Sequence, residues 1–276
     1  MNDNATTYYE IKNNNNVFYG IVISKFNEIT VSIGGKVKGC VQFIIRREKQ
    51  CEMERTGFDE RCNVDGNLMR SSGTITMLQS AISFIFQMFP NVKKIRLRDN
   101  SYVMCGNSTI FLPHLQLLEY GLTWYERVLF AELEDKSYKT IIQHYITIVT
   151  QNPIVQWDYL WNIIKMYDTR YEKELHKLWK TSKSIRDIIV YLKKNNKCDM
   201  FYKWIYGLFE TITMNKVEIE NIWYIINRND TYNVLFTKLE TNPSYIKSLE
   251  TRKNIKELKY FGGFTTNKLF PITRYF

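Results

Sequence analysis

The sequence has few of the residues that end helices and strands or that cross-link a chain. Its 276 residues include only 5 Pro and 12 Gly, and its 5 Cys contain no C-x-x-C pair. An odd cysteine count without that spacing argues against a disulfide framework and against a zinc-binding pattern. We therefore expect mostly buried free thiols in a reducing compartment. The alternative is a disulfide between Cys51 and Cys62, which flank a polar segment.

Long apolar runs and strong catalytic motifs are also missing. No run is long enough to cross a bilayer, and the opening MNDNATTYYE lacks the basic and apolar regions of a signal peptide. We expect a cytoplasmic protein without a membrane span. There is no G-x-S-x-G motif, and His114, His144 and His176 lie far apart without a partner at i+4. We expect no metal site.

Apolar and basic residues are abundant. Hydrophobic residues make up 45% and aromatic residues 15%, which is enough for a sizeable core. The formal net charge is +10, and the stretch from Pro243 onward carries 7 basic and 2 acidic residues. This basic C-terminal arm favours an acidic partner, such as nucleic acid, a phosphorylated surface or an acidic protein. The alternatives are a solvated face and an arm that docks on a neighbouring subunit.

The N-terminal part reads as a sheet. Alternating β-branched and aromatic residues predict an antiparallel meander, to which residues 7–12 can add an edge strand; the predicted strands are 17–24, 28–34 and 36–48. The charged segment 49–69 has no clear period, so we expect a loop or a hairpin insert there.

A helix and a strand follow. Apolar residues at helical spacing predict a helix over 74–89, and alternation predicts a strand over 92–98. The order strand, helix, strand suggests a parallel crossover onto the same sheet. Residues 99–109 read as a polar connector, and 112–130 reads as one helix with Pro113 near its start.

Beyond Asp135 the pattern is helical throughout. The predicted helices are 137–151, 154–180, 184–194, 199–212, 216–228, 233–240 and 243–260. We therefore expect an α+β fold with a mixed sheet and covering helices in residues 1–133, followed by an all-helical domain in residues 134–276. Trp157 and Trp161 are four residues apart and are expected to be core.

Two stretches offer candidate chemistry. Arg70, Ser71, Ser72 and Gly73 lead directly into the 74–89 helix, and a helix N-terminus has free N–H groups that can hold a phosphate. The alternative is an ordinary serine N-cap. Tyr125 lies in an aromatic cluster and is a candidate general acid. The alternative is that Trp124 and Tyr125 pack the helix on the sheet.

The strand, the R-x-x-G turn, the helix, the next strand and a later helix with W-Y-E resemble the core of the GNAT superfamily of N-acetyltransferases. The resemblance covers roughly residues 17–131. It implies that Arg70, Ser71, Ser72 and Gly73 hold the pyrophosphate of acetyl-CoA. It also implies that Tyr125 protonates the departing thiolate while an acetyl group is transferred to an amine. On this hypothesis the protein is a GNAT-like enzyme, active or degenerate.

A second resemblance is to uncharacterised proteins of large cytoplasmic DNA viruses. It is carried by I-x-L-x-D-x-S and L-x-Y-G-x-T-W-Y-E, that is by Asp99, Ser101, Tyr120, Gly121, Thr123, Trp124, Tyr125 and Glu126. It implies a location in the host cytoplasm or the virion. The competing hypothesis is therefore a non-enzymatic viral structural or assembly protein that acts through protein or nucleic-acid contacts.

Overall fold

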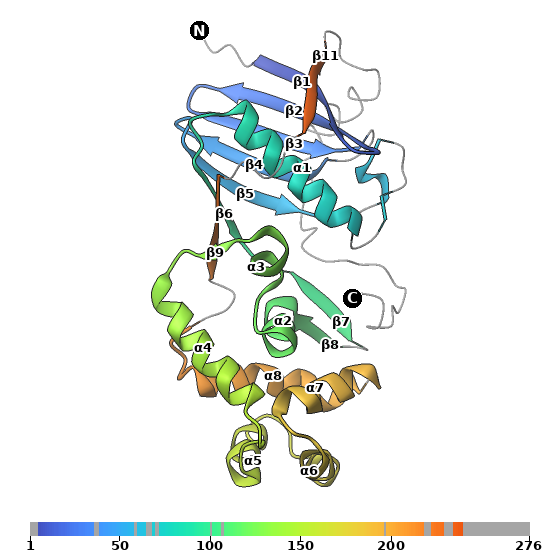
Figure 1. Ribbon diagram of the computed structural model, residues 1–276, viewed down its shortest axis with the longest axis vertical. Coiled ribbons are helices and arrows are strands. Elements are labelled where there is room, and N and C mark those ends of the chain that lie inside the picture. Colours follow the sequence, from blue (N-terminus) through green and yellow to red (C-terminus); the bar gives the residue numbers. More distant parts are fainter. Residues whose placement is uncertain are drawn as a thin grey trace. The chain divides into compact units, whose positions relative to one another are not determined.

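The protein has a mixed α+β fold with a large mixed sheet (Figure 1). The computed structural model describes residues 5–35, 39–57, 60–64, 68–69, 72–99, 101–105, 108–195, 197–217, 222–228 and 234–239. The basic C-terminal arm and the helix predicted over 243–260 lie outside these residues. Two compact units are present. The first holds the described residues up to Leu97 and from Ile225 onward, and the second holds those from Arg98 to Tyr224.

The first unit is built on an antiparallel meander, as the sequence predicts. Its five strands are β1 (Ala5–Asn13), β2 (Asn16–Lys25), β3 (Glu28–Gly34), β4 (Gly39–Arg46) and β5 (Gln50–Thr56). Of the two alternatives for residues 49–69, the loop is wrong for 50–56, because these residues form β5 in a hairpin with β4. In this strand Cys51 and Met53 are buried, while Glu52 between them and Glu54 and Arg55 after them are charged. Two inward residues are too short an alternation to stand out in a charged segment.

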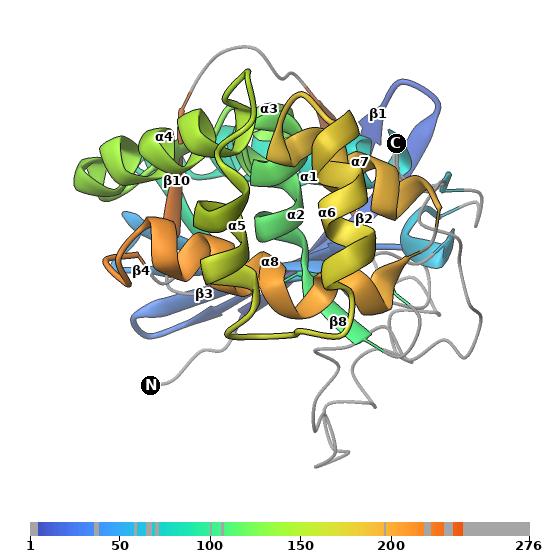
Figure 2. The same cartoon turned by 90° about the horizontal axis from the view of Figure 1, so that it is seen from below.

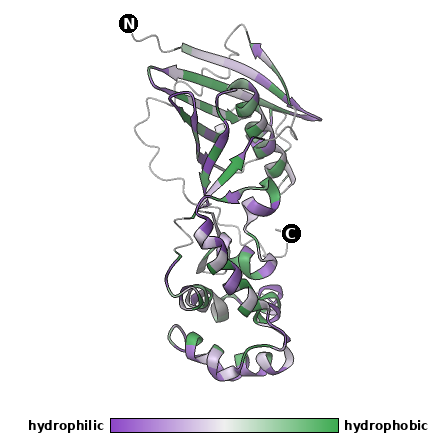
Figure 3. Ribbon diagram, turned by 60° about the vertical axis from the view of Figure 1, so that its left-hand side comes forward, coloured by the Kyte–Doolittle hydropathy of each residue, from purple (hydrophilic) through white to green (hydrophobic). Residues whose placement is uncertain are grey.

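The crossover is confirmed. Helix α1 (Ser72–Met88) connects β5 to β6 (Lys94–Arg98), and the two strands pair in parallel with Cys51 opposite Ile95 and Met53 opposite Leu97. Helix α1 lies across one face of the sheet (Figure 1). The core between them consists of alternate strand residues and the inner face of α1, and includes Ile11, Phe18, Val31, Phe43, Ile45, Phe84 and Ile85. Figure 3 shows hydrophobic residues along these strands and along α1.

The helices predicted over 216–228 and 233–240 are wrong. These segments form β10 (Trp223–Asn227) and β11 (Leu235–Leu239), so the C-terminal half is not all-helical. A short apolar run such as WYIIN has no period that separates a strand from a buried helix. The strand order is β11-β1-β2-β3-β4-β5-β6-β10-β9, with β9 at Glu132–Leu133. Residues 7–12 are therefore in a strand, but β11 makes that strand an inner one.

The return of β10 and β11 to the first sheet also decides the chain division. Arg228 donates its backbone N–H to the Lys93 oxygen (2.9 Å) and its guanidinium to the oxygens of Phe89 and Val92. Long-range hydrogen bonds of this kind cannot be seen in local sequence periods. The units consequently divide at residues 97 and 224, whereas the sequence suggested one boundary near residue 133.

Helices dominate the second unit. The predicted polar connector 99–109 is instead a hairpin of β7 (Tyr102–Cys105) and β8 (Ser108–Phe111). The predicted helix 112–130 is two helices, α2 (Leu112–Tyr120) and α3 (Trp124–Leu129). Three predicted helices are confirmed as α4 (Lys136–Thr150), α7 (Ile185–Lys194) and α8 (Cys198–Ile212).

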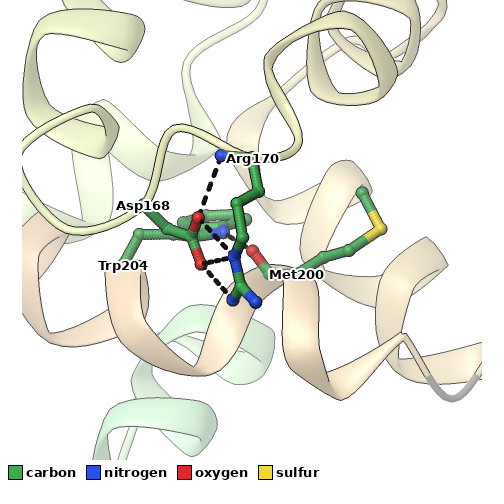
Figure 4. Close-up of polar contacts among 4 residues, drawn as sticks. All are labelled: Asp168, Arg170, Met200 and Trp204. Atoms are coloured by element: carbon green, nitrogen blue, oxygen red, sulfur yellow. Dashed lines mark hydrogen bonds and ion pairs between the residues drawn. The ribbon is translucent and has the colours of Figure 1, made fainter.

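The long helix predicted over 154–180 is also two helices, α5 (Trp157–Ile164) and α6 (Glu172–Thr181). The turn between them is held by Asp168, whose buried carboxylate accepts hydrogen bonds from the Arg170 backbone N–H (3.0 Å) and guanidinium (2.5–3.1 Å; Figure 4). This hydrogen bonding by Arg170 lowers the pKa of Asp168 to about 2. Asp168 and Arg170 together stabilise a turn that amphipathic spacing alone does not predict.

The expectation of mostly free thiols is wrong. Cys40 on β4 and Cys62 in a short 3₁₀ turn (Glu60–Cys62) form a disulfide, with their Cα atoms 5.8 Å apart. Cys198 is also disulfide-bonded. Cys51 is a buried free thiol, so the alternative pairing of Cys51 with Cys62 is wrong as well. The fold, not the spacing in sequence, brings Cys40 and Cys62 together.

Candidate functional site

The predicted phosphate-binding turn lies at the start of α1. Arg70 and Ser71 are outside the described residues, Ser72 is exposed and Gly73 is buried. The Gly73 backbone N–H donates to the Met69 carbonyl oxygen at 2.9 Å. A Cβ atom on Gly73 would lie only 2.7 Å from Leu68 Cγ. Gly73 therefore lets Leu68 pack on the helix start, and its N–H already has a protein acceptor.

The predicted general acid belongs to the other unit. Tyr125 on α3 is 4% exposed, and its ring centroid lies 5.2 Å from that of Trp124 and 6.1 Å from that of Tyr224. Burial, and then the nearby charge of Asp99, raise the pKa of Tyr125 well above its usual value. Its phenol is thus a poor proton donor toward water or ligand, although it packs well. Ser72 and Gly73 lie in the first unit.

Asp99, in the second unit, is a deeply buried carboxyl group with a raised pKa. It is 2% exposed and accepts hydrogen bonds from the Ser101 backbone N–H (3.0 Å) and from the Ser101 hydroxyl. Burial raises its pKa to about 6 despite these bonds. The charge of Asp99, after burial itself, raises the pKa values of Tyr125 and Tyr224, so the three groups lie near one another. The cluster can hold a proton near neutral pH.

Most of the Y-G-x-T-W-Y-E segment has a local structural role. Gly121 (φ 72°) ends α2 in the left-handed region and donates its N–H to the Leu117 oxygen. Glu126 accepts from both the Thr123 N–H and the Thr123 hydroxyl at 2.9 Å, which caps the start of α3. The Arg127 guanidinium lies 3.9 Å from the Tyr120 ring centroid. The segment therefore encodes a sharp break between two helices.

Polar groups also hold α7 against this break. Lys193 pairs with Glu119 at 2.5 Å, and both side chains are largely buried. The Arg186 guanidinium donates to the Leu118 oxygen at 2.6 Å, at the end of α2. These contacts partner charged groups that the packing of α2 and α7 buries, although Glu119 Oε2 and Arg186 Nη2 are left without a hydrogen-bond partner, and they link the two helices.

An aromatic cluster on α5 and α6 was not recognised from the sequence. Trp157 and Trp161 stack with centroids 5.5 Å apart and an interplanar angle of 9°. His176 lies 4.6 Å from Trp157 and is stacked with Trp179 at 5.7 Å. All four rings are only half-buried. The prediction that Trp157 and Trp161 are core is therefore wrong, because helical spacing identifies a stripe but not what covers it.

A row of lysines lies beside this cluster. Lys173, Lys177 and Lys180 on α6 are all exposed, and their i, i+4, i+7 spacing puts them on one face of the helix. None of them forms an ion pair with a carboxylate among the residues that the structure describes. Figure 2 shows α5 and α6 side by side. The spacing of the lysines can be read from the sequence, but the sequence does not show that the rings of α5 lie near them.

Among the residues that the structure describes, no group of three or more His, Cys, Asp or Glu side chains could hold a metal ion. No helix in the same ranges has the length and apolar character needed to cross a membrane.

Comparisons with known proteins give no match: no family model, no curated protein and no solved structure corresponds to the chain. The function is therefore inferred from the chain's own residues.

Proposed function

We propose that the protein is a non-enzymatic structural or assembly protein of viral type, associated with the virion or capsid and acting in the host cytoplasm through protein or nucleic-acid contacts. One observation carries this proposal. The N–H of Gly73 is bonded to Met69, and Leu68 covers the glycine, so this amide is not presented to a ligand.

The observation matters because a pyrophosphate is bound mainly through free backbone N–H groups at a helix start. A phosphate oxygen at Gly73 would have to displace both the Met69 carbonyl and the Leu68 side chain. Tyr125 is equally inaccessible, since it is 4% exposed. Both residues are instead explained by packing.

The second candidate is a GNAT-like N-acetyltransferase, and the parallel β5–α1–β6 crossover favours it. In that function Arg70, Ser71, Ser72 and Gly73 hold the pyrophosphate, and Tyr125 is the general acid. Acetyl-CoA would supply the acetyl group. Met53 is the last residue of β5 that pairs with β6, opposite Leu97, and β5 continues beyond it to Thr56, as a site that opens between two strands requires.

A thermal-shift titration with acetyl-CoA and with CoA separates the two candidates. A ligand at about 100 times its dissociation constant stabilises a protein by about 2.7 kcal/mol, which raises the unfolding midpoint measurably. We expect no rise at millimolar cofactor.

The matched control is Ser72→Glu. A carboxylate in the first turn suits the helix dipole but repels a pyrophosphate. A rise in the unfolding midpoint of the wild type that is lost in Ser72→Glu contradicts the structural proposal and establishes the cofactor site.

A further inference from the structure

We infer that the exposed surface of α5 and α6 binds single-stranded nucleic acid, with the aromatic cluster stacking on bases and the lysine row contacting phosphates. The inference rests on the proposed function, because it names the partner through which such a protein would act. It assigns the contact to described residues of the second unit and does not use the basic C-terminal arm that the sequence pointed to.

The rings of the aromatic cluster join α5 to α6, but the two helices do not fully bury them. Helices α5 and α6 already have an apolar face, formed by Leu160, Ile163, Ile164 and Leu175, each no more than 4% exposed. Trp157 and Trp161 share a face of α5 with Leu160 and Ile164, by their i, i+3, i+4, i+7 spacing, yet all four rings of the cluster remain only partly buried. Keeping three indoles and an imidazole partly in water leaves apolar area uncovered, which a ligand could bury.

The rings are also held in place. The Trp179 indole N–H donates to the Val155 carbonyl oxygen at 2.8 Å, which fixes that ring. Trp157 contacts Trp161, His176 and Trp179, with ring centroids 4.6–6.0 Å apart. A preorganised set of flat rings loses little entropy when a base stacks on it, and base stacking tolerates any sequence.

The lysines supply the complementary charge. Lys173, Lys177 and Lys180 span two helical turns, about 10 Å along the axis, next to His176 and Trp179. The acidic residues of α6 do not cancel this row. Glu174 points toward Lys197, with which it pairs at 3.9 Å, and Glu172 is at the N-terminal end.

This combination fits a nucleic acid better than an acidic protein or an anionic membrane. An acidic peptide would use the lysines but gains nothing specific from stacked indoles. A membrane surface favours rings at the tip of a protrusion with an apolar rim, whereas these rings lie in the seam between two helices. Single strands present both flat bases and regularly spaced phosphates.

The test is fluorescence anisotropy of a labelled 20-nucleotide oligo-dT with the full-length protein. The test variant is Lys173→Ala/Lys177→Ala/Lys180→Ala. The control is Lys136→Ala/Lys139→Ala/Lys216→Ala, which removes the same charge from exposed lysines elsewhere in the second unit. We expect the test variant to bind at least tenfold more weakly and to reduce the slope of log K against log salt by about 2. The control variant should bind like the wild type.

The rings are tested separately with Trp161→Ala and Trp161→Phe. Alanine should weaken binding about tenfold, and phenylalanine, which keeps a flat ring, should restore most of it. Circular dichroism confirms that each variant is folded.

Equal loss in the two lysine variants, full binding by Trp161→Ala, or no binding of oligo-dT by the wild type would overturn the inference. So would anionic vesicles that bind with the same lysine dependence while oligo-dT does not compete. None of these results affects the proposed non-enzymatic role, which fails only if acetyl-CoA stabilises the protein through Ser72.

Discussion

Two sets of aromatic rings, one in each compact unit, show how differently the same residue type is used. In the first unit Phe84 of α1 packs edge-to-face against Tyr9 of β1 (5.3 Å) and Phe236 of β11 (5.1 Å), and Phe84 is fully buried. In the second unit the rings of Trp157, Trp161, His176 and Trp179 contact one another but are only partly buried.

The difference lies in what covers the rings. The sheet covers Phe84 on the inner face of α1, whereas α5 and α6 bury their aliphatic residues fully and the rings between them only in part. The first set therefore contributes to stability and the second is available for recognition. An aromatic content of 15% cannot distinguish these uses.

The two sets of rings can be tested directly by removing one ring from each. Phe84→Ala should lower the free energy of unfolding by about 3–5 kcal/mol, because it empties a fully buried site. Trp161→Ala should cost only about 1–2 kcal/mol, because the Trp161 side chain is already partly exposed to water. Urea denaturation measures both. Similar losses for the two variants would mean that both rings are core.

The first unit also contains the Cys40–Cys62 disulfide, which should contribute to its stability. Cys40→Ser/Cys62→Ser removes a cross-link between residues 22 positions apart and should cost about 3 kcal/mol of stability, because the unfolded chain regains loop entropy. The measurement is urea denaturation without reductant. Reductant should also destabilise the double variant less than the wild type. If reductant destabilises the double variant as much as the wild type, the Cys40–Cys62 bond does not account for the loss of stability that reductant causes.

The second unit also contains a buried carboxyl group whose protonation should affect stability. The pKa of Asp99 is raised to about 6 in the folded protein, above its unfolded value of about 3.9. Its contribution to stability is therefore full below pH 4 and is lost as pH rises through 6. Asp99→Asn should accordingly gain about 2–3 kcal/mol relative to wild type between pH 4 and pH 7.

The readout is the difference in unfolding free energy between Asp99→Asn and wild type at several pH values. Asp168→Asn is the opposite control, because Arg170 lowers the pKa of Asp168. Its loss of stability should be constant above pH 5 and shrink only as pH falls toward 2. A flat profile for Asp99→Asn would mean that the carboxyl is hydrated in solution.

The part of the fold that sequence reasoning recovered is the part with long, regular periods. The meander, α1, the strand at 94–98 and helices α4, α7 and α8 follow from alternation or helical spacing. The misses are short or mixed elements. Strand β5 is hidden by its charged outer face, β10 by its apolar run, and the breaks at Gly121 and Asp168 by amphipathic patterns that continue across them.

The candidate site shows the same limit. A serine-glycine turn before a helix is compatible with a phosphate site and with a packed helix start, and the position of Leu68 separates the two. Likewise, the sequence lists the lysines and tryptophans of 157–180, but only the turn at Asp168 folds α6 back beside α5.

The sequence by itself determined the α+β character, the parallel crossover and the excess of positive charge, because these depend on local periods and composition. The tertiary structure alone decided which cysteines pair, that β10 and β11 return to the first sheet, and which rings and lysines share a surface. Each of these depends on contacts between residues distant in the chain, which are fixed by packing and long-range hydrogen bonds and leave no period in the sequence.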